Sequence, residues 1–135
     1  MTAKQYLSRA CNLKRLISAK ELHLMELRTQ AEHITADLTG MPRGSGTTSP
    51  VERIAVQIAD LSLDLEQDWL DLIAYQEEIR KTISYVKDPV LYQLLTFRYI
   101  CYNSWNEISE RMLYSRSHIF RLHTKALGIV DELIR

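Results

Sequence analysis

The chain has 135 residues, and its 17 lysine and arginine residues balance 17 aspartate and glutamate residues, so the formal net charge is zero. Such a length suits one domain, or one small module with an extension, and 46% apolar with 25% charged residues excludes wholesale disorder. Only 4 Gly and 3 Pro occur, which favours long helices and argues strongly against an all-β fold. No run of about 18 apolar residues is present, so we expect no membrane-spanning helix and no membrane partner.

Two long helices are predicted on either side of a loop. Residues 39–50 concentrate Gly, Pro, Ser and Thr, which predicts a flexible loop. On both sides of it, apolar residues recur in alternating steps of three and four, with Lys20 and Asp68 as the missing members. The stripes are Ala10, Leu13, Ile17, Leu24, Leu27, Ala31, Ile34 and Leu38, and then Val51, Ile54, Ile58, Leu61, Leu65, Leu72, Tyr75 and Ile79. Because this spacing is typical of a coiled-coil seam, residues 1–87 are predicted to form an antiparallel helical hairpin.

The two stripes match when the chain folds at the loop so that paired residue numbers sum to 88 or 89. The pairs are then Leu38 with Val51, Ile34 with Ile54, Leu27 with Leu61, Leu24 with Leu65, and Ile17 with Leu72. Lys20 and Asp68 lie at the same level in this register, and we expect an ion pair between them that fixes the register. The alternative is that both side chains reach water independently.

The flanks of the seam carry more apolar residues than two helices can bury. These residues are Leu7, Leu16, Met25, Leu63, Trp69, Leu70 and Ile73. They require a third surface, which is either the C-terminal part of the chain or a second copy. The expected assembly is a homodimer.

Residues 88–135 are predicted to form three short helices, each preceded by a residue typical of an N-cap: Asp88, Ser104 and Ser115. The first helix is expected from Val90 to about Tyr99, a turn at Leu113 and Tyr114 separates the other two, and the last helix runs to about Ile134. The expected buried residues are Leu91, Leu94, Leu95, Phe97, Ile108, Met112, Ile119, Leu122, Ala126, Leu127, Val130 and Ile134. This order is the helix-turn-helix layout. The predicted fold class is all-α, a long helical hairpin followed by a small helix-turn-helix domain over 88–135.

The first turns of the last helix enter the major groove in a helix-turn-helix domain. From Arg111 to Lys125 the chain has four basic residues and no acidic residue, as a phosphate-facing surface requires. The expected DNA-binding residues are Arg111, Arg116, Ser117, His118, Arg121, Thr124 and Lys125. Arg116 and Arg121 are candidates for base-edge contacts, because arginine binds guanine with two hydrogen bonds. The alternative is a helical bundle that merely has one basic helix.

Several motifs in this region resemble region 4 of bacterial sigma factors. They are Leu95-x-x-Arg98-Tyr99, Ser104-Trp-Asn-Glu107-Ile108, Met112-Leu-Tyr-Ser115-Arg116-Ser117-x-Ile119 and Lys125-Ala126-Leu127. The turn and the helical region before it resemble the phage and prophage regulators of the ArpU and RinA type more closely. This resemblance implies a phage transcription regulator in the cytoplasm of a bacterial host. It would bind double-stranded DNA, and would either recruit or modify RNA polymerase or simply occupy an operator. Two residues depart from the sigma pattern: Ser109 replaces the usual alanine, and Leu113 replaces a glycine that often takes positive φ.

No catalytic, metal or cofactor site is expected, so the protein is not predicted to be an enzyme. The four histidines lack the i,i+4 pair of a zinc-binding helix, and no H-E-x-x-H or C-x-x-C motif occurs. The two cysteines are far apart, which indicates free thiols in a reducing compartment. Two other functions stay open: a small terminase subunit for phage DNA packaging, and a protein whose helix-turn-helix binds polymerase rather than DNA.

Overall fold

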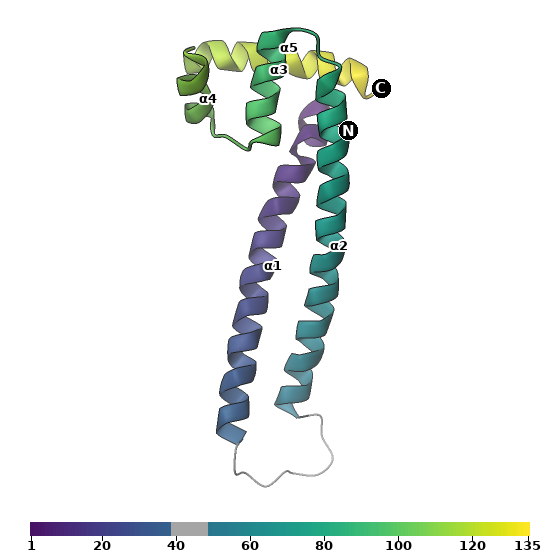
Figure 1. Cartoon of the computed structure of the whole chain (residues 1–135), viewed down its shortest axis with the longest axis vertical. Coiled ribbons are helices and arrows are strands. Elements are labelled where there is room, and N and C mark those ends of the chain that lie inside the picture. Colours follow the sequence, from purple (N-terminus) through teal and green to yellow (C-terminus); the bar gives the residue numbers. More distant parts are fainter. Residues whose placement is uncertain (39–48) are drawn as a thin grey trace. The chain divides into compact units, whose positions relative to one another are not determined.

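The computed structural model describes residues 1–38 and 49–135, and none of the elements in these ranges is a strand (Figure 1). The hairpin arms are α1 (Ala3–Leu38) and α2 (Pro50–Ser84), each about 50 Å long at 1.5 Å per residue. The C-terminal elements are α3 (Pro89–Leu95), the π-helical turn η1 (Thr96–Ile100), α4 (Trp105–Met112) and α5 (Arg116–Leu133). The predicted all-α fold class is confirmed. Of the predicted loop, residues 39–48 lie outside the described residues.

The chain divides into two compact units, and the division differs from the boundary predicted between residues 87 and 88. One unit is Met1–Leu13 together with Asp71–Arg135, and the other is Lys14–Leu70. The first turns of α1 belong with the C-terminal helices because Ala3 and Leu7 are buried there. The backbone N–H of Ala3 also donates a hydrogen bond of 2.7 Å to the Asp131 carboxylate on α5.

Side chains cap the helices at their first turns, as expected from the sequence for the C-terminal helices. Asp88 accepts hydrogen bonds from the backbone N–H groups of Val90 and Leu91, Ser104 accepts one from Glu107, and Ser115 accepts one from His118. At the start of α1, Thr2 and Gln5 form a capping box, in which each side chain accepts a bond from the other's backbone N–H. These bonds satisfy N–H groups that a helix leaves unpaired at its start.

The predicted seam is confirmed within the Lys14–Leu70 unit. Its buried members are Ile17, Leu24, Leu27, Ile54 and Leu65, and its half-buried members are Ala31, Ile34, Val51, Ile58 and Leu61. Lys20 Nζ lies 2.7 Å from Asp68 Oδ2, so the predicted ion pair is also confirmed. The hydrogen bond to Asp68 raises the pKa of Lys20, and partial burial opposes this shift. The expected contact of Leu38 with Val51 involves a side chain outside the described part of the chain.

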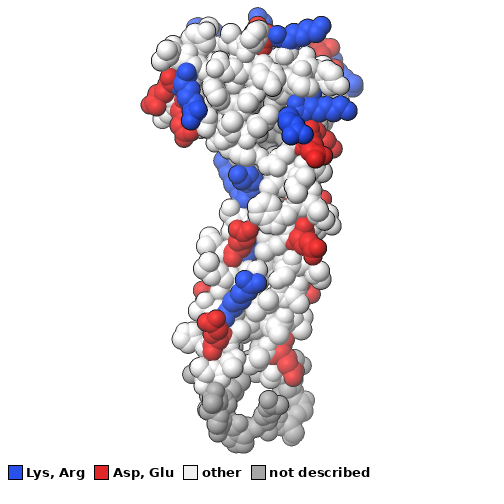
Figure 2. Space-filling model, in the orientation of Figure 1, with Lys and Arg blue, Asp and Glu red and all other residues white. Residues whose placement is uncertain are grey.

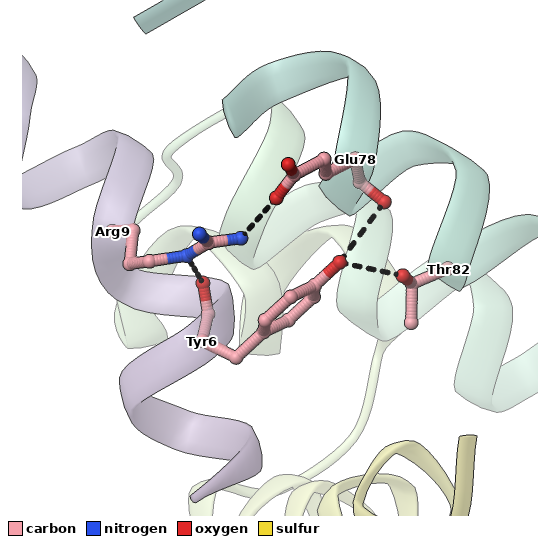
Figure 3. A network of polar contacts seen from close by, with 4 residues as sticks. All are labelled: Tyr6, Arg9, Glu78 and Thr82. Atoms are coloured by element: carbon pink, nitrogen blue, oxygen red, sulfur yellow. Dashed lines mark hydrogen bonds and ion pairs between the residues drawn. The ribbon is translucent and has the colours of Figure 1, made fainter. Parts of the chain in front are cut away.

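In the other unit, four residues join the first turns of α1 to the last turns of α2 (Figure 3). The Tyr6 hydroxyl lies 2.9 Å from the Thr82 hydroxyl, and the Arg9 guanidinium donates to the Glu78 carboxylate at 2.6 Å. Arg9 also lies over the rings of Tyr6 and Tyr75. The paired residue numbers sum to 88 and 87, so these contacts follow the register of the Lys20–Asp68 pair.

The core of the C-terminal helices includes a cluster of Leu94, Ile108, Met112 and Ile119. Leu91, Leu95, Ala126 and Val130 are buried as predicted, whereas Phe97, Leu122, Leu127 and Ile134 are half-buried. Tyr99 and His123 are buried although neither was expected to be. In the wide turn η1 the Cys101 N–H donates to the Thr96 carbonyl, and Tyr99 is the buried residue of this turn.

Candidate nucleic-acid interface

The turn between α4 and α5 is held by its own side chains. Leu113 adopts φ 59° and ψ 35°, which is the left-handed conformation. In the sigma pattern a glycine often takes positive φ at this place. The Ser109 hydroxyl donates to the Tyr114 carbonyl at 2.5 Å. Serine in place of the usual alanine therefore supplies a hydrogen bond across the turn. Both departures from the sigma pattern are accommodated, and α5 begins directly after Ser115.

The predicted DNA-binding residues lie mainly on the exposed surface of α4 and α5. On α5, a buried stripe of Ile119, His123, Ala126 and Val130 faces inward. Of the predicted residues, those exposed on α5 are Arg116, Ser117, Arg121, Thr124 and Lys125, and Arg111 is exposed at the end of α4. Helical spacing puts Ser117, Arg121, Thr124 and Lys125 on the side of α5 opposite the buried stripe, whereas Arg116 lies beside the stripe. His118 is half-buried.

Several of these side chains make contacts within the C-terminal helices. The His118 ring meets the Tyr114 ring edge to face, with 4.6 Å between centroids. The Thr124 hydroxyl donates to the Phe120 carbonyl at 3.0 Å, so its oxygen is left as an acceptor. The guanidinium of Arg116 lies 5.7 Å from the centroid of Phe120, and that of Arg111 lies 5.6 Å from the centroid of Phe97.

A buried pair behind this surface connects η1 to α5. The Tyr99 hydroxyl lies 2.6 Å from His123 Nε2. Burial lowers the pKa of His123 to about 4, and the positive charges of Arg98 and Lys4 act in the same direction. Burial also raises the pKa of Tyr99 to about 12. Near neutral pH the histidine is therefore uncharged, and either the Tyr99 hydroxyl or Nε2 is the donor of this hydrogen bond, depending on the tautomer of the ring.

Aromatic contacts extend this pair to the start of α4. The Trp105 ring meets the His123 ring edge to face, with 4.6 Å between centroids. The guanidinium of Arg98 lies 4.3 Å from the Trp105 ring centroid and donates to the Asn103 carbonyl at 3.0 Å. Burial of His123 was not predicted from the sequence, although this residue continues the three-and-four spacing of Ile119, Ala126 and Val130.

Charge is distributed unevenly over the C-terminal helices. Figure 2 shows basic side chains around them, with acidic side chains close to α4. Along the chain, no acidic residue lies between Arg111 and Val130.

Among the described residues, no group of three or more His, Cys, Asp or Glu side chains is placed to hold a metal ion. Over the same ranges, no helix is both long enough and apolar enough to cross a membrane.

Comparison with known proteins gives a family and no further relative. No curated protein and no solved structure matches the chain. A family described as "Protein of unknown function (DUF1492)" matches residues 39–131, which include α2, α3, η1, α4 and most of α5. Because this match covers more than half of the sequence, the chain belongs to the DUF1492 family.

Proposed function

We propose that this protein is a sequence-specific DNA-binding transcription regulator that reads the major groove with α5. The observation that carries the proposal is the exposed face of α5, which presents basic and hydroxyl side chains and no acidic residue before Asp131. An α-helix fits the major groove, and positive charge on it attracts the phosphates on either side. The capped turn before α5 supports the proposal because it holds the start of this helix in a defined direction.

The residues divide by the contacts they are suited to make. Arg116 and Arg121, on the first two turns of α5, are proposed to bind guanine edges. Ser117 and Thr124 are proposed to assist them, while Arg111 and Lys125 neutralise phosphates. His118 has a smaller role in this scheme, since its ring packs against Tyr114.

The hairpin is proposed to join two copies of the chain. Leu7 is buried in the unit that contains the C-terminal helices, but Leu16, Met25, Leu63, Trp69, Leu70 and Ile73 are exposed. Exposed apolar side chains in such number favour a protein partner. A dimer binding two half-sites suits a regulator. We propose the phage type that the turn motif resembles, in a bacterial cytoplasm and with RNA polymerase as a further partner. An assembly of eight or more copies would instead favour the small terminase subunit.

Selection of bound sites from random DNA tests the proposal, followed by titration of the selected site with variants. We expect Arg116→Ala or Arg121→Ala to weaken binding to that site by about 1–3 kcal/mol, and binding to random DNA by less. Arg53→Ala, which removes an exposed positive charge from α2, is the matched control and should change neither affinity much.

Two results would contradict this function. Equal losses on the selected site and on random DNA would leave charge attraction without base recognition. If the protein does not bind DNA even at low salt, where phosphate contacts are strongest, the helix-turn-helix serves a protein partner instead.

A further inference from the structure

The exposed face of α5 includes an aromatic ring. Phe120 is 42% exposed, one helical turn after Arg116 and directly before Arg121. Complete burial of a phenylalanine would contribute to stability, so a half-exposed ring on this helix is a feature to explain.

Contacts on two sides hold the Phe120 ring in place. The Trp105 ring meets it edge to face, with 5.3 Å between centroids and 74° between planes. Trp105 is itself fixed by His123 and by the guanidinium of Arg98. The guanidinium of Arg116 lies 5.7 Å from the Phe120 centroid. The ring is therefore a fixed apolar surface beside two exposed arginines, at the end of a chain of packed side chains that begins at the Tyr99–His123 pair.

We infer that Phe120 is a specificity-determining residue that contacts the methyl group of a thymine in the major groove. This inference rests on the proposed DNA-binding function. The 5-methyl group of thymine is the apolar group that base pairs present in that groove, and phenylalanine is among the side chains that contact it. A thymine here would lie close to the guanines assigned to Arg116 and Arg121, because Phe120 follows Arg116 by one helical turn and directly precedes Arg121.

The test replaces single thymines of the selected site by deoxyuridine, which keeps every hydrogen-bonding group and lacks only the methyl. At one position, the exchange should weaken binding of the wild-type protein about fourfold, as expected for one buried methyl group. Phe120→Ala should bind the thymine and deoxyuridine sites equally. Phe120→Leu, which keeps an apolar side chain, should retain part of the discrimination. Thermal melting establishes that each variant is folded.

The possible outcomes distinguish failure of the methyl contact from failure of the proposed DNA-binding function. If wild-type protein binds a selected site but no deoxyuridine exchange changes its affinity, the methyl contact is wrong and the regulator proposal stands. The same holds if Phe120→Ala discriminates thymine from deoxyuridine as the wild type does, or if Phe120→Ala leaves affinity unchanged. If no site is selected at all, both proposals fail, and the ring belongs to a surface for a protein partner.

Discussion

At the scale of single residues, the Tyr99–His123 pair links the interior of the C-terminal helices to their exposed face. His123 is only 8% exposed, and its ring contacts both Tyr99 and Trp105. Trp105 in turn supports Phe120 on α5. Since a buried polar group is costly unless it is hydrogen-bonded, the hydrogen bond between Tyr99 and Nε2 is what makes a neutral histidine tolerable at this position.

Stability should therefore fall in acid because His123 must gain a proton on unfolding. Its pKa is about 4 in the folded protein, against 6.5 for the unperturbed side chain. Between these values the unfolded chain binds more protons, so the contribution is present above pH 6.5 and is lost as the pH falls through 4. We expect a loss of about 2–3 kcal/mol in the free energy of unfolding, measured by urea denaturation at a series of pH values.

His123→Gln tests the assignment, because glutamine keeps an acceptor for Tyr99 and does not titrate. This variant should show a flatter pH dependence between 4 and 6.5, and His23→Gln, at an exposed position, should keep the wild-type dependence. Identical pH profiles for wild type and His123→Gln would show that another group is responsible.

For the residues of the C-terminal helices, some positions and conformations could be predicted from the sequence and others could not. The exposed arginines of α5 follow from helical spacing, because side chains opposite a buried stripe must face outward. The π-helical turn η1 could not be predicted, because no residue pattern in Thr96–Ile100 indicates it. The left-handed conformation of Leu113 could be expected only from the place of the turn, since leucine itself disfavours positive φ.

At the scale of elements, the Lys20–Asp68 pair is the polar layer of an otherwise apolar seam. The side chains of Lys20 and Asp68 are 24% and 15% exposed, so both are partly buried and each charge is compensated by the other. Shifting one arm by a single heptad would place each charge against an apolar layer. The pair therefore favours this register over its neighbours.

Replacing one partner should harm the hairpin more than replacing both. Lys20→Leu leaves Asp68 partly buried without its cation, whereas Lys20→Leu combined with Asp68→Leu gives two apolar layers that can pack. We expect the single variant to melt at the lower temperature in circular dichroism. Asp60→Leu, which removes an exposed acid from the same arm, serves as the control. A double variant whose loss equals or exceeds that of Lys20→Leu would show that the pair does not couple.

Helix ends and seams could be predicted because they depend on local spacing and on capping residues. The division into units could not, because it depends on contacts between distant segments. The bond from the Ala3 N–H to Asp131 spans nearly the whole sequence, and neither residue belongs to a repeating pattern that indicates the other. Burial of Ala3 and Leu7 follows from the same long-range packing.

At the scale of the whole molecule, zero net charge conceals three regions of different sign. Residues 1–50 carry seven basic and four acidic residues, residues 51–86 carry three and eight, and residues 87–135 carry seven and five. The four basic residues from Arg111 to Lys125 are therefore compatible with a neutral total. So small a positive region predicts modest non-specific affinity for DNA, and two linked copies would raise the affinity for a site with two half-sites.

The exposed side of α2 carries the surface suited to joining those copies. Val56, Leu63 and Leu70 recur every seven residues and are 59%, 65% and 58% exposed. Residues with this spacing lie on one side of a helix and can form a seam with another helix. If two copies of α2 pack antiparallel about a two-fold axis at Leu63, Val56 lies opposite Leu70 of the partner subunit and no like charges meet along the stripe.

Leu63→Glu should convert a dimer into a monomer, because it places a carboxylate at the centre of this stripe. In sedimentation equilibrium the wild type should have twice the chain mass of 15.7 kDa, and the variant the mass of one chain. Gln57→Glu adds the same charge at an exposed position of α2 outside the stripe and should leave the dimer intact. A wild type that is monomeric at all concentrations, or a Leu63→Glu protein that remains dimeric, would assign the stripe to a different partner. Loss of the dimer should also weaken binding to a two-fold symmetric DNA site far more than to a single half-site, because only the dimer gains from the second contact.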